Sequence, residues 1–241
     1  MKRLDVYLFE QKLFPTREKA KEAVISGIVY KNGKVCTKAG EKVLDFDKIE
    51  IIGEKLKYVS RAGIKLEKAK HEWNIDFNNK VVLDVGASTG GFTDFVLQNG
   101  AIKVYAVDVG TNQLHASLVT NPKVVNLEKT DFRQLNNIPD KIDIAVCDCS
   151  FISLKLLCSK FSELLAKETP LITLIKPQFE CGKQIAQKTK GVIKDINLSN
   201  FLKNDVINYF TENGFCFIGD TVSPILGTAG NTEYLAYFVK N

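Results

Sequence analysis

Histidine is scarce in this chain of 241 residues, and cysteine is present without paired spacing. Only His71 and His115 occur, which is too little imidazole for a histidine-rich zinc site or a Ser-His-Asp triad. The six cysteines contain no Cys-x-x-Cys pair. We therefore expect reduced thiols that pack as small apolar residues in a cytoplasmic protein, and no metal site.

Long hydrophobic runs are also missing. No segment approaches the length of a membrane span, and the start of the chain lacks the apolar core of a signal peptide. Hydrophobic residues make up 45% of the chain and charged residues 25%, which is ordinary for a globular protein. These features predict no contact with a membrane.

The positive charge is unevenly distributed. The net charge is +5, and residues 1–60 hold 13 Lys and Arg against nine Asp and Glu. The rest of the chain is almost balanced. This asymmetry predicts a polyanionic partner for the N-terminal quarter.

The N-terminal segment, residues 1–52, is predicted to form a small separate domain. Apolar residues at helical spacing predict helices within residues 4–9 and 16–27. Asn32-Gly33 between two apolar segments predicts a β-hairpin. We interpret residues 53–59 as a linker to a larger domain.

The larger domain, residues 60–241, alternates strand-like and helix-like segments. This alternation predicts a mostly parallel sheet with helices on both faces. The expected strands are 80–85, 102–107, 124–127, 142–147, 171–175, 215–222 and 233–239, and the expected helices are 91–99, 112–119, 153–166 and 196–213.

A glycine-rich turn follows the first of these strands. The segment from Asp84 to Thr93 reads Asp-Val-Gly-Ala-Ser-Thr-Gly-Gly-Phe-Thr, and Asp108 ends the next strand. Glycines let the backbone approach a ligand, and a carboxylate at that place can hold two ribose hydroxyls. The spacing fits neither a dinucleotide fingerprint nor a P-loop. It favours S-adenosylmethionine, the alternative being an ordinary strand-to-helix connection.

Four charged residues are expected near the same edge of the sheet. Asp148 and Lys176 each end an apolar strand, Glu233 opens the last strand, and Lys65 lies on the helix before the first. A buried lysine paired with carboxylates can lose its proton within reach of neutral pH and serve as a general base. The alternative is a structural salt bridge.

The small domain resembles the αL-type RNA-binding motif of a small-subunit ribosomal protein and of pseudouridine synthases. The matching strings are Arg3-Leu4-Asp5, Thr16 to Ala20, Gly27-Ile28-Val29 and Asn32-Gly33. The resemblance implies an RNA-facing surface, although the same charges could form a solvated face. Its candidate residues are Arg3, Arg17, Lys19, Lys31, Lys34 and Arg61.

The whole chain resembles the TlyA family, ribosomal RNA 2′-O-methyltransferases historically called haemolysins, with an FtsJ-like catalytic domain. The strings that carry the resemblance are Tyr58 to Leu66, Asp84 to Thr93, Cys149 to Leu154, Ile175 to Glu180 and Gly230 to Tyr234. The fold implied is α/β: a Rossmann-like, seven-stranded class I methyltransferase sheet preceded by a small α+β RNA-binding domain.

The resemblance also implies roles for individual residues. Lys176 would take the proton from a ribose 2′-hydroxyl, while Lys65, Asp148 and Glu233 would orient this hydroxyl and tune the lysine. The partner would be ribosomal RNA in ribosomal subunits, with cytidine as the target and no obligate protein partner; whether one or both subunits are modified stays open. Contacts to S-adenosylmethionine map to Gly86, Gly90, Phe92, Asp108, Asp131 and Asp148.

Two other functions remain open from the sequence. One is a ribosome-binding assembly factor whose methyltransferase domain only senses cofactor. The other is a membrane-lytic haemolysin, for which the sequence offers neither a signal peptide nor an apolar span.

Overall fold

The structure is a computed structural model that describes the chain except residues 15, 26, 53–56 and 228, and except the side chains of residues 18, 19 and 22. It divides into two compact units, Met1–Arg61 and Ala62–Asn241. We call them the small unit and the large unit. The linker predicted at 53–59 falls partly outside the described residues.

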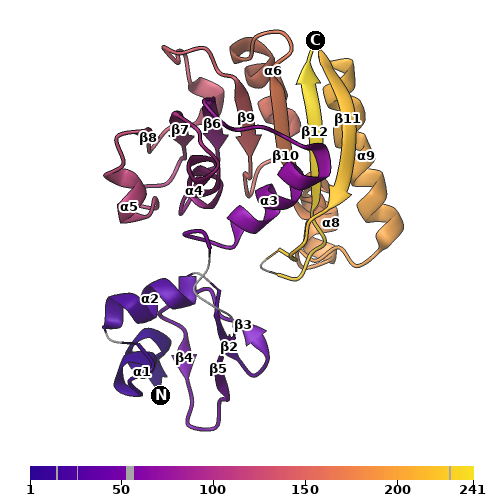
Figure 1. Ribbon diagram of the computed structural model, residues 1–241. Coiled ribbons are helices and arrows are strands. Elements are labelled where there is room, and N and C mark those ends of the chain that lie inside the picture. Colours follow the sequence, from indigo (N-terminus) through magenta and orange to yellow (C-terminus); the bar gives the residue numbers. More distant parts are fainter. Residues whose placement is uncertain (15, 26, 53–56, 228) are drawn as a thin grey trace. The chain divides into compact units, whose positions relative to one another are not determined.

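The described part of the small unit contains two helices and two small antiparallel sheets (Figure 1). Three strands pair in the order β3-β2-β5, while the two-residue strands β1 and β4, which the sequence did not predict, pair with each other. The elements are β1 (Lys2–Arg3), α1 (Leu4–Glu10), α2 (Arg17–Ile25), β2 (Val29–Lys31), β3 (Lys34–Val35), β4 (Lys42–Val43) and β5 (Ile49–Ile51).

The Asn-Gly hairpin is confirmed. Asn32 and Gly33 have φ angles of 52° and 76°, and Lys31 pairs with Lys34 across the two-residue loop. Asparagine and glycine tolerate this left-handed backbone, which matches the twist of the two strands. Apolar residues of both helices share one core with Val29 of β2; this core includes Leu4, Leu8, Ala20, Ala23, Val24 and Val29.

The large unit contains a seven-stranded sheet in the order β11-β12-β10-β9-β6-β7-β8. All neighbouring pairs from β10 to β8 are parallel, and β12 is antiparallel to both of its neighbours. Every predicted strand is present within two residues of its expected ends. The strands are β6 (Val81–Val85), β7 (Lys103–Val107), β8 (Val124–Leu127), β9 (Ile144–Cys147), β10 (Pro170–Ile175), β11 (Phe215–Val222) and β12 (Tyr234–Lys240).

Helices cover both faces of this sheet (Figure 1). On one face Leu83 and Val85 share a core with Phe161 and Phe210 from two of the helices. On the other face the side chain of Asp84 reaches Thr93 of α4. The helices are α3 (Ala62–Trp73), α4 (Gly91–Gln98), α5 (Ala116–Val119), η1 (Phe132–Gln134), α6 (Lys155–Leu164), α7 (Pro177–Glu180), α8 (Gly182–Lys188) and α9 (Ile196–Glu212).

Four helical details differ from the sequence prediction. Helix α5 is shorter than the expected 112–119, because it starts only after His115, which caps it. Helices α7, α8 and η1 were not predicted. Each is short, and the polar run 182–190 has too little apolar periodicity to reveal a helix.

The topology brings several strand ends to one edge. Parallel strands β6, β7, β9 and β10 all end there, and Ile175 at the end of β10 pairs with Tyr234 at the start of β12. The residues directly beyond these ends therefore become neighbours, which is the usual place of a ligand site in an open α/β sheet.

Candidate active site

Two lysines and two acids meet at the carboxyl edge of the sheet, as the sequence predicted. Lys176 Nζ lies 2.6 Å from Asp148 Oδ1. Lys65 Nζ lies 2.9 Å from Glu233 Oε2 and 3.4 Å from Asp148 Oδ2. We call Lys65, Asp148, Lys176 and Glu233 the tetrad.

The tetrad is largely removed from water, with side chains between 4% and 13% exposed. Burial of Asp148 favours its neutral form, but Lys176 and Lys65 outweigh burial and hold its pKa below the ordinary value. Burial of Lys176 alone would lower its pKa, but Asp148 and Glu233 reverse this and raise it. The expectation that pairing brings Lys176 close to neutral titration is therefore wrong for the protein alone.

Glu233 is placed by the loop that precedes β12. A Cβ on Gly227 would lie 2.4 Å from Glu233 Oε1, so only glycine fits there without moving the carboxylate. Asn231, 2% exposed, accepts a hydrogen bond from Ile193 N and donates one to Gly191 O. Both bonds fasten the loop to the segment 191–193. Neither Gly227 nor Asn231 was given a role from the sequence.

Two further polar residues touch the tetrad and were also missed. Lys176 Nζ donates to Ser150 Oγ at 2.9 Å, and Gln178 Nε2 donates to Glu233 Oε1 at 3.4 Å. Each stands two residues after a charged tetrad member, and this spacing is the signal that could have identified them.

The glycine turn after β6 is tightly packed. Gly86 and Gly90 have φ angles of 82° and 91°. A Cβ on Gly86 would lie 2.9 Å from Cys149 Sγ, and one on Gly90 would lie 2.2 Å from Leu118 Cδ1. The turn therefore presents bare backbone beside Asp148, a cradle that side chains would fill.

Asp108 ties this turn to the end of β7. Its Oδ2 accepts from Ser88 N at 2.8 Å and its Oδ1 from Gly110 N at 2.7 Å. Each carboxylate oxygen keeps a second acceptor position, as two ribose hydroxyls require. Asp131 lies near this end of the sheet, since Thr130 N donates to Asp108 O, but its carboxylate is held by Arg133.

Asp84 lies beneath the turn and is fully buried. Its Oδ2 accepts from Thr93 Oγ1 at 2.6 Å, and among the described residues its Oδ1 has no hydrogen-bond partner. Burial raises its pKa to about 7, against the hydrogen bond from Thr93, which lowers it. An unpartnered buried carboxylate oxygen beside a bare-backbone turn fits a ligand with a cationic amino group.

Phe92 lies inside the large unit rather than at a surface. It is 2% exposed, so its side chain packs the core below the turn. The free acceptor positions of Asp108 suit the nucleoside end of S-adenosylmethionine. The bare glycine turn above the buried carboxylate of Asp84 suits its amino acid end.

Arg3 and Arg17 share one buried carboxylate in the small unit. Arg3 Nε donates to Asp5 Oδ1 at 2.9 Å, and Arg17 Nε donates to Asp5 Oδ2 at 3.0 Å. These bonds, Arg3 first, lower the pKa of Asp5 to about 2 against the effect of burial. Both arginine side chains stay about half exposed, so they can also face an anion.

The other candidate RNA contacts differ in their freedom. Lys31 pairs with Glu41 and donates to Lys42 O, whereas Lys34 is exposed on the hairpin. The Arg61 side chain packs over Gly27, where a Cβ would lie 2.3 Å from its Cδ. The side chain of Lys19 lies outside the described residues.

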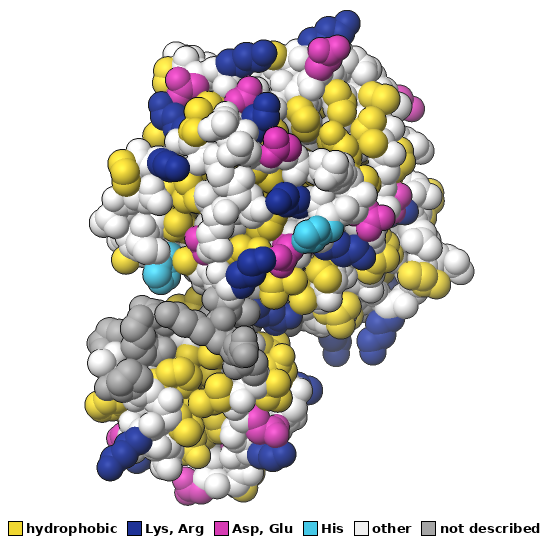
Figure 2. All heavy atoms as spheres, in the orientation of Figure 1, with side chains coloured by type: hydrophobic (Ala, Val, Ile, Leu, Met, Phe, Trp, Pro, Cys, Tyr) yellow, Lys and Arg dark blue, Asp and Glu magenta, His cyan; other side chains and the backbone are white. Residues whose placement is uncertain are grey.

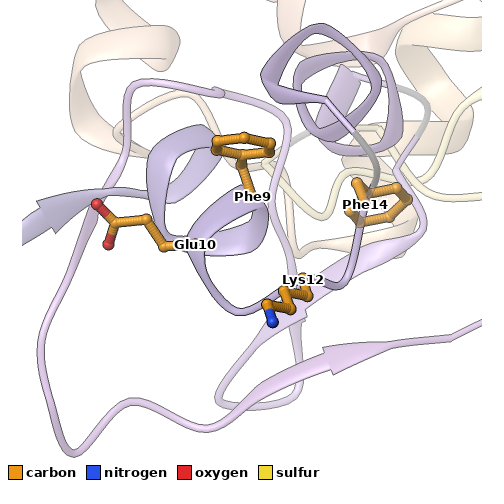
Figure 3. Close-up of a pocket in the computed structure, with 4 residues that line it drawn as sticks. All are labelled: Phe9, Glu10, Lys12 and Phe14. Atoms are coloured by element: carbon orange, nitrogen blue, oxygen red, sulfur yellow. The ribbon is translucent and has the colours of Figure 1, made fainter.

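Surface features add little to this assignment. On the face seen in Figure 2, basic and acidic side chains are interspersed over the described part of both units. A hollow in the small unit is lined by Phe9, Glu10, Lys12 and Phe14 (Figure 3). It contains no tetrad residue, and the chemistry of the site does not depend on it.

Comparison with known families defines the class of protein. Residues 58–240 match the FtsJ-like methyltransferase family, and residues 2–49 match the S4 domain. The fold is that of a class I methyltransferase joined to an S4 domain, and the cofactor is S-adenosylmethionine.

Full-length relatives narrow the class to one family. Hemolysin A of Brachyspira hyodysenteriae is 43% identical over 98% of this chain and 99% of its own. The 16S/23S rRNA (cytidine-2′-O)-methyltransferase TlyA of Mycobacterium tuberculosis is 35% identical over 98% of this chain and 88% of its own. A solved hemolysin-like protein from Streptococcus thermophilus superposes with a TM-score of 0.78 at 40% identity, over 99% of this chain and 88% of its own. The chain belongs to the TlyA family of FtsJ-like methyltransferases.

One structural finding bears on the haemolysin names in this family. Among the described residues, no helix is both long enough and apolar enough to cross a membrane.

Proposed function

We propose that this enzyme methylates the 2′-hydroxyl of a cytidine ribose in ribosomal RNA within ribosomal subunits, with Lys176 as the general base. The observation that carries the proposal is the buried ion pair of Lys176 with Asp148, 2.6 Å long, directly beside the turn at Gly86. The name of the Mycobacterium tuberculosis relative supports cytidine and the 2′ position.

Each tetrad member has a separate task. Lys176 accepts the proton of the ribose hydroxyl, and Asp148 holds the lysine in place. Lys65 donates to Glu233 and Asp148, and so compensates one of their two negative charges when Lys176 is neutral. The bound cofactor supplies a methyl group on a positively charged sulfur, already activated for transfer. The ribose oxygen that Lys176 deprotonates would take this methyl group as the bond from carbon to sulfur breaks, and the cofactor would leave as a neutral thioether. Orientation alone can contribute about 7–11 kcal/mol.

The raised pKa of Lys176 must fall before the lysine can act as a base. The positively charged sulfur of the bound cofactor would destabilise a nearby ammonium group and lower its pKa. Closure of the site by RNA adds desolvation, which acts in the same direction. The tetrad therefore keeps Lys176 protonated at rest and prepares it for release of the proton only in the loaded enzyme.

The small unit provides the RNA contact in this proposal. Arg3, Arg17 and Lys34 are exposed enough to meet phosphates, and phosphate contacts position a protein without reading sequence. Arg61 and Lys19 belong to the same proposed surface.

The alternative function is a ribosome-binding assembly factor that senses cofactor without transferring methyl groups. An enzyme with an intact base and an assembly factor differ in one measurement, the incorporation of tritiated methyl groups into isolated ribosomal subunits. A membrane-lytic protein would instead release dye from liposomes.

The decisive variant is Lys176→Ala, with Lys188→Ala on the exposed end of α8 as the matched control. We expect Lys176→Ala to bind S-adenosylmethionine as the wild type does and to lose methyl transfer by at least about a hundredfold. Mass-spectrometric mapping of methylated riboses would identify the nucleotide. Near-normal turnover of Lys176→Ala refutes the assigned base.

A further inference from the structure

Ser150 lies on the turn that follows β9 and faces the end of β10. Its Oγ accepts a hydrogen bond from Lys176 Nζ at 2.9 Å, although Ser150 itself is exposed and Lys176 is 6% exposed. The serine therefore covers the amino group of Lys176 from the open side of the site.

The Lys176 ammonium group donates two hydrogen bonds, to Ser150 Oγ at 2.9 Å and to the carbonyl oxygen of Asp148 at 3.4 Å. Its 2.6 Å contact with Asp148 Oδ1 is an ion pair without hydrogen-bond geometry. A neutral amine keeps two N–H groups and gains one lone pair. The shorter of the two hydrogen bonds, to Ser150 Oγ, therefore fixes the direction of one N–H group of the amine.

We propose that Ser150 is a positioning residue: by accepting one N–H group of neutral Lys176 it fixes the rotation of the amine and so aims it for removal of the ribose proton. The proposal rests on the proposed function, because it needs Lys176 to act as the base. It gives Ser150 a task that alanine cannot perform and threonine can.

The turn that carries Ser150 has a strained backbone and is held by hydrogen bonds to a neighbouring helix. Phe151 has a φ of 64°, a left-handed conformation that costs a bulky residue stability. Glu180 of α7 holds the same turn, accepting from Ser153 Oγ at 2.5 Å and from Leu154 N at 2.9 Å. The Phe151 ring, 90% exposed, rests 5.1 Å from the ring of Phe179. The position of Ser150 is therefore fixed by the fold.

Several groups besides Ser150 act on the charge of Lys176. Asp148, Glu233 and Cys147 favour its charged form, and Lys65 lies beyond the two acids. Ser150 adds an acceptor that also favours the charged form. Its removal should therefore lower the pKa of Lys176 while spoiling the aim of the neutral amine.

These two effects move activity in opposite directions. In Ser150→Ala the plateau rate of methyl transfer should fall about tenfold, while the rising limb of the pH–rate profile should shift about half a unit to lower pH. A general structural defect lowers the rate without moving the limb downward. The affinity for RNA should stay unchanged, so the loss appears in kcat rather than KM.

The experiment compares Ser150→Ala, Ser150→Thr and the control Ser159→Ala, which changes an exposed serine on α6. One readout is the pH–rate profile of methyl transfer to ribosomal subunits. The second is independent of cofactor: NMR titration of ¹³C-lysine-labelled protein without ligand, with the Lys176 signal assigned from its absence in Lys176→Arg. We expect Ser150→Ala to lower the titration midpoint of Lys176, and Ser150→Thr and Ser159→Ala to match the wild type.

An unchanged rate and midpoint in Ser150→Ala overturns the proposal, and so does a slower enzyme whose Lys176 midpoint has not moved. Failure of Ser150→Thr to restore the rate overturns it as well. An active Lys176→Ala refutes the proposed function and with it the aiming role. An inactive Lys176→Ala with an unaffected Ser150→Ala refutes only the assignment of Ser150.

Discussion

Lys65 and Glu233 form a buried ion pair with 2.9 Å between Nζ and Oε2, although 168 residues separate them in the chain. The pair joins α3, at the start of the large unit, to the beginning of β12, the last strand. Both side chains are at most 10% exposed. The contact therefore belongs to the core of the site and has consequences for stability as well as for catalysis.

Removal of one partner should destabilise the large unit. Among the described residues, Glu233→Ala leaves Lys65 with Asp148 at 3.4 Å as its ion-pair partner, and breaking a buried pair costs about 3–5 kcal/mol. The control Glu163→Ala removes the 58% exposed partner of Lys160 and should cost less than about 1 kcal/mol. Urea unfolding monitored by the fluorescence of Trp73, the only tryptophan, measures both. Equal losses in the two variants would show that Glu233 is not part of a buried network.

Gly90 should be irreplaceable for cofactor binding. In Gly90→Ala the new Cβ would lie 2.2 Å from Leu118 Cδ1 and 2.8 Å from Leu114 Cδ1, on a backbone with φ of 91°. We expect the affinity for S-adenosylmethionine, measured by calorimetry, to fall at least about tenfold, which corresponds to about 1.4 kcal/mol. Gly191→Ala separates strain from clash, because Gly191 has φ of 75° and no atom near its Cβ position. If both variants bind normally, the turn does not hold the cofactor.

Asp84 should make the stability of the large unit depend on pH. Its pKa is about 7 in the folded protein and about 3.8 unfolded, so the folded state holds the proton more tightly. Stability from this group is lost as pH rises from about 4 to 7 and is not recovered above 7. Asp84→Asn keeps an acceptor for Thr93 and removes this dependence. We expect the free energy of unfolding of Asp84→Asn, relative to that of the wild type, to be about 2–4 kcal/mol higher at pH 8 than at pH 4.5 in urea unfolding. The same difference between the two proteins at pH 4.5 and at pH 8 would contradict the burial argument.

Lys34 is a better probe of RNA binding than Arg17. Charge reversal at Arg17 would break its bond to Asp5 and disturb the fold, whereas Lys34 is exposed on the hairpin. Lys34→Glu should weaken binding to ribosomal RNA and reduce the slope of log affinity against log salt by about one. The control Lys167→Glu alters an exposed lysine before β10, at the edge of the sheet opposite the tetrad. A salt series in which Lys34→Glu matches the wild type would exclude this residue from the RNA surface.

Local sequence pattern was sufficient for the elements and for the position of the charged residues along them. Apolar runs predicted all seven strands of the large unit because a buried strand needs continuous apolar side chains. The same runs showed that Asp148 and Lys176 follow strand ends. The short helices α7 and α8, and the two-residue strands β1 and β4, carry too few residues for any periodicity to identify them.

Pairing and protonation were decided only by the tertiary structure. The sequence indicated that Lys176 is buried, and burial alone lowers a lysine pKa; the structure raises it because Asp148 lies at 2.6 Å. Ser150, Gly227 and Asn231 acquire their roles in the same way, through contacts with residues distant in the chain. Hydrophobic periodicity is a property of neighbours in sequence, whereas electrostatic interaction depends on distances of a few ångströms, which only the folded chain fixes.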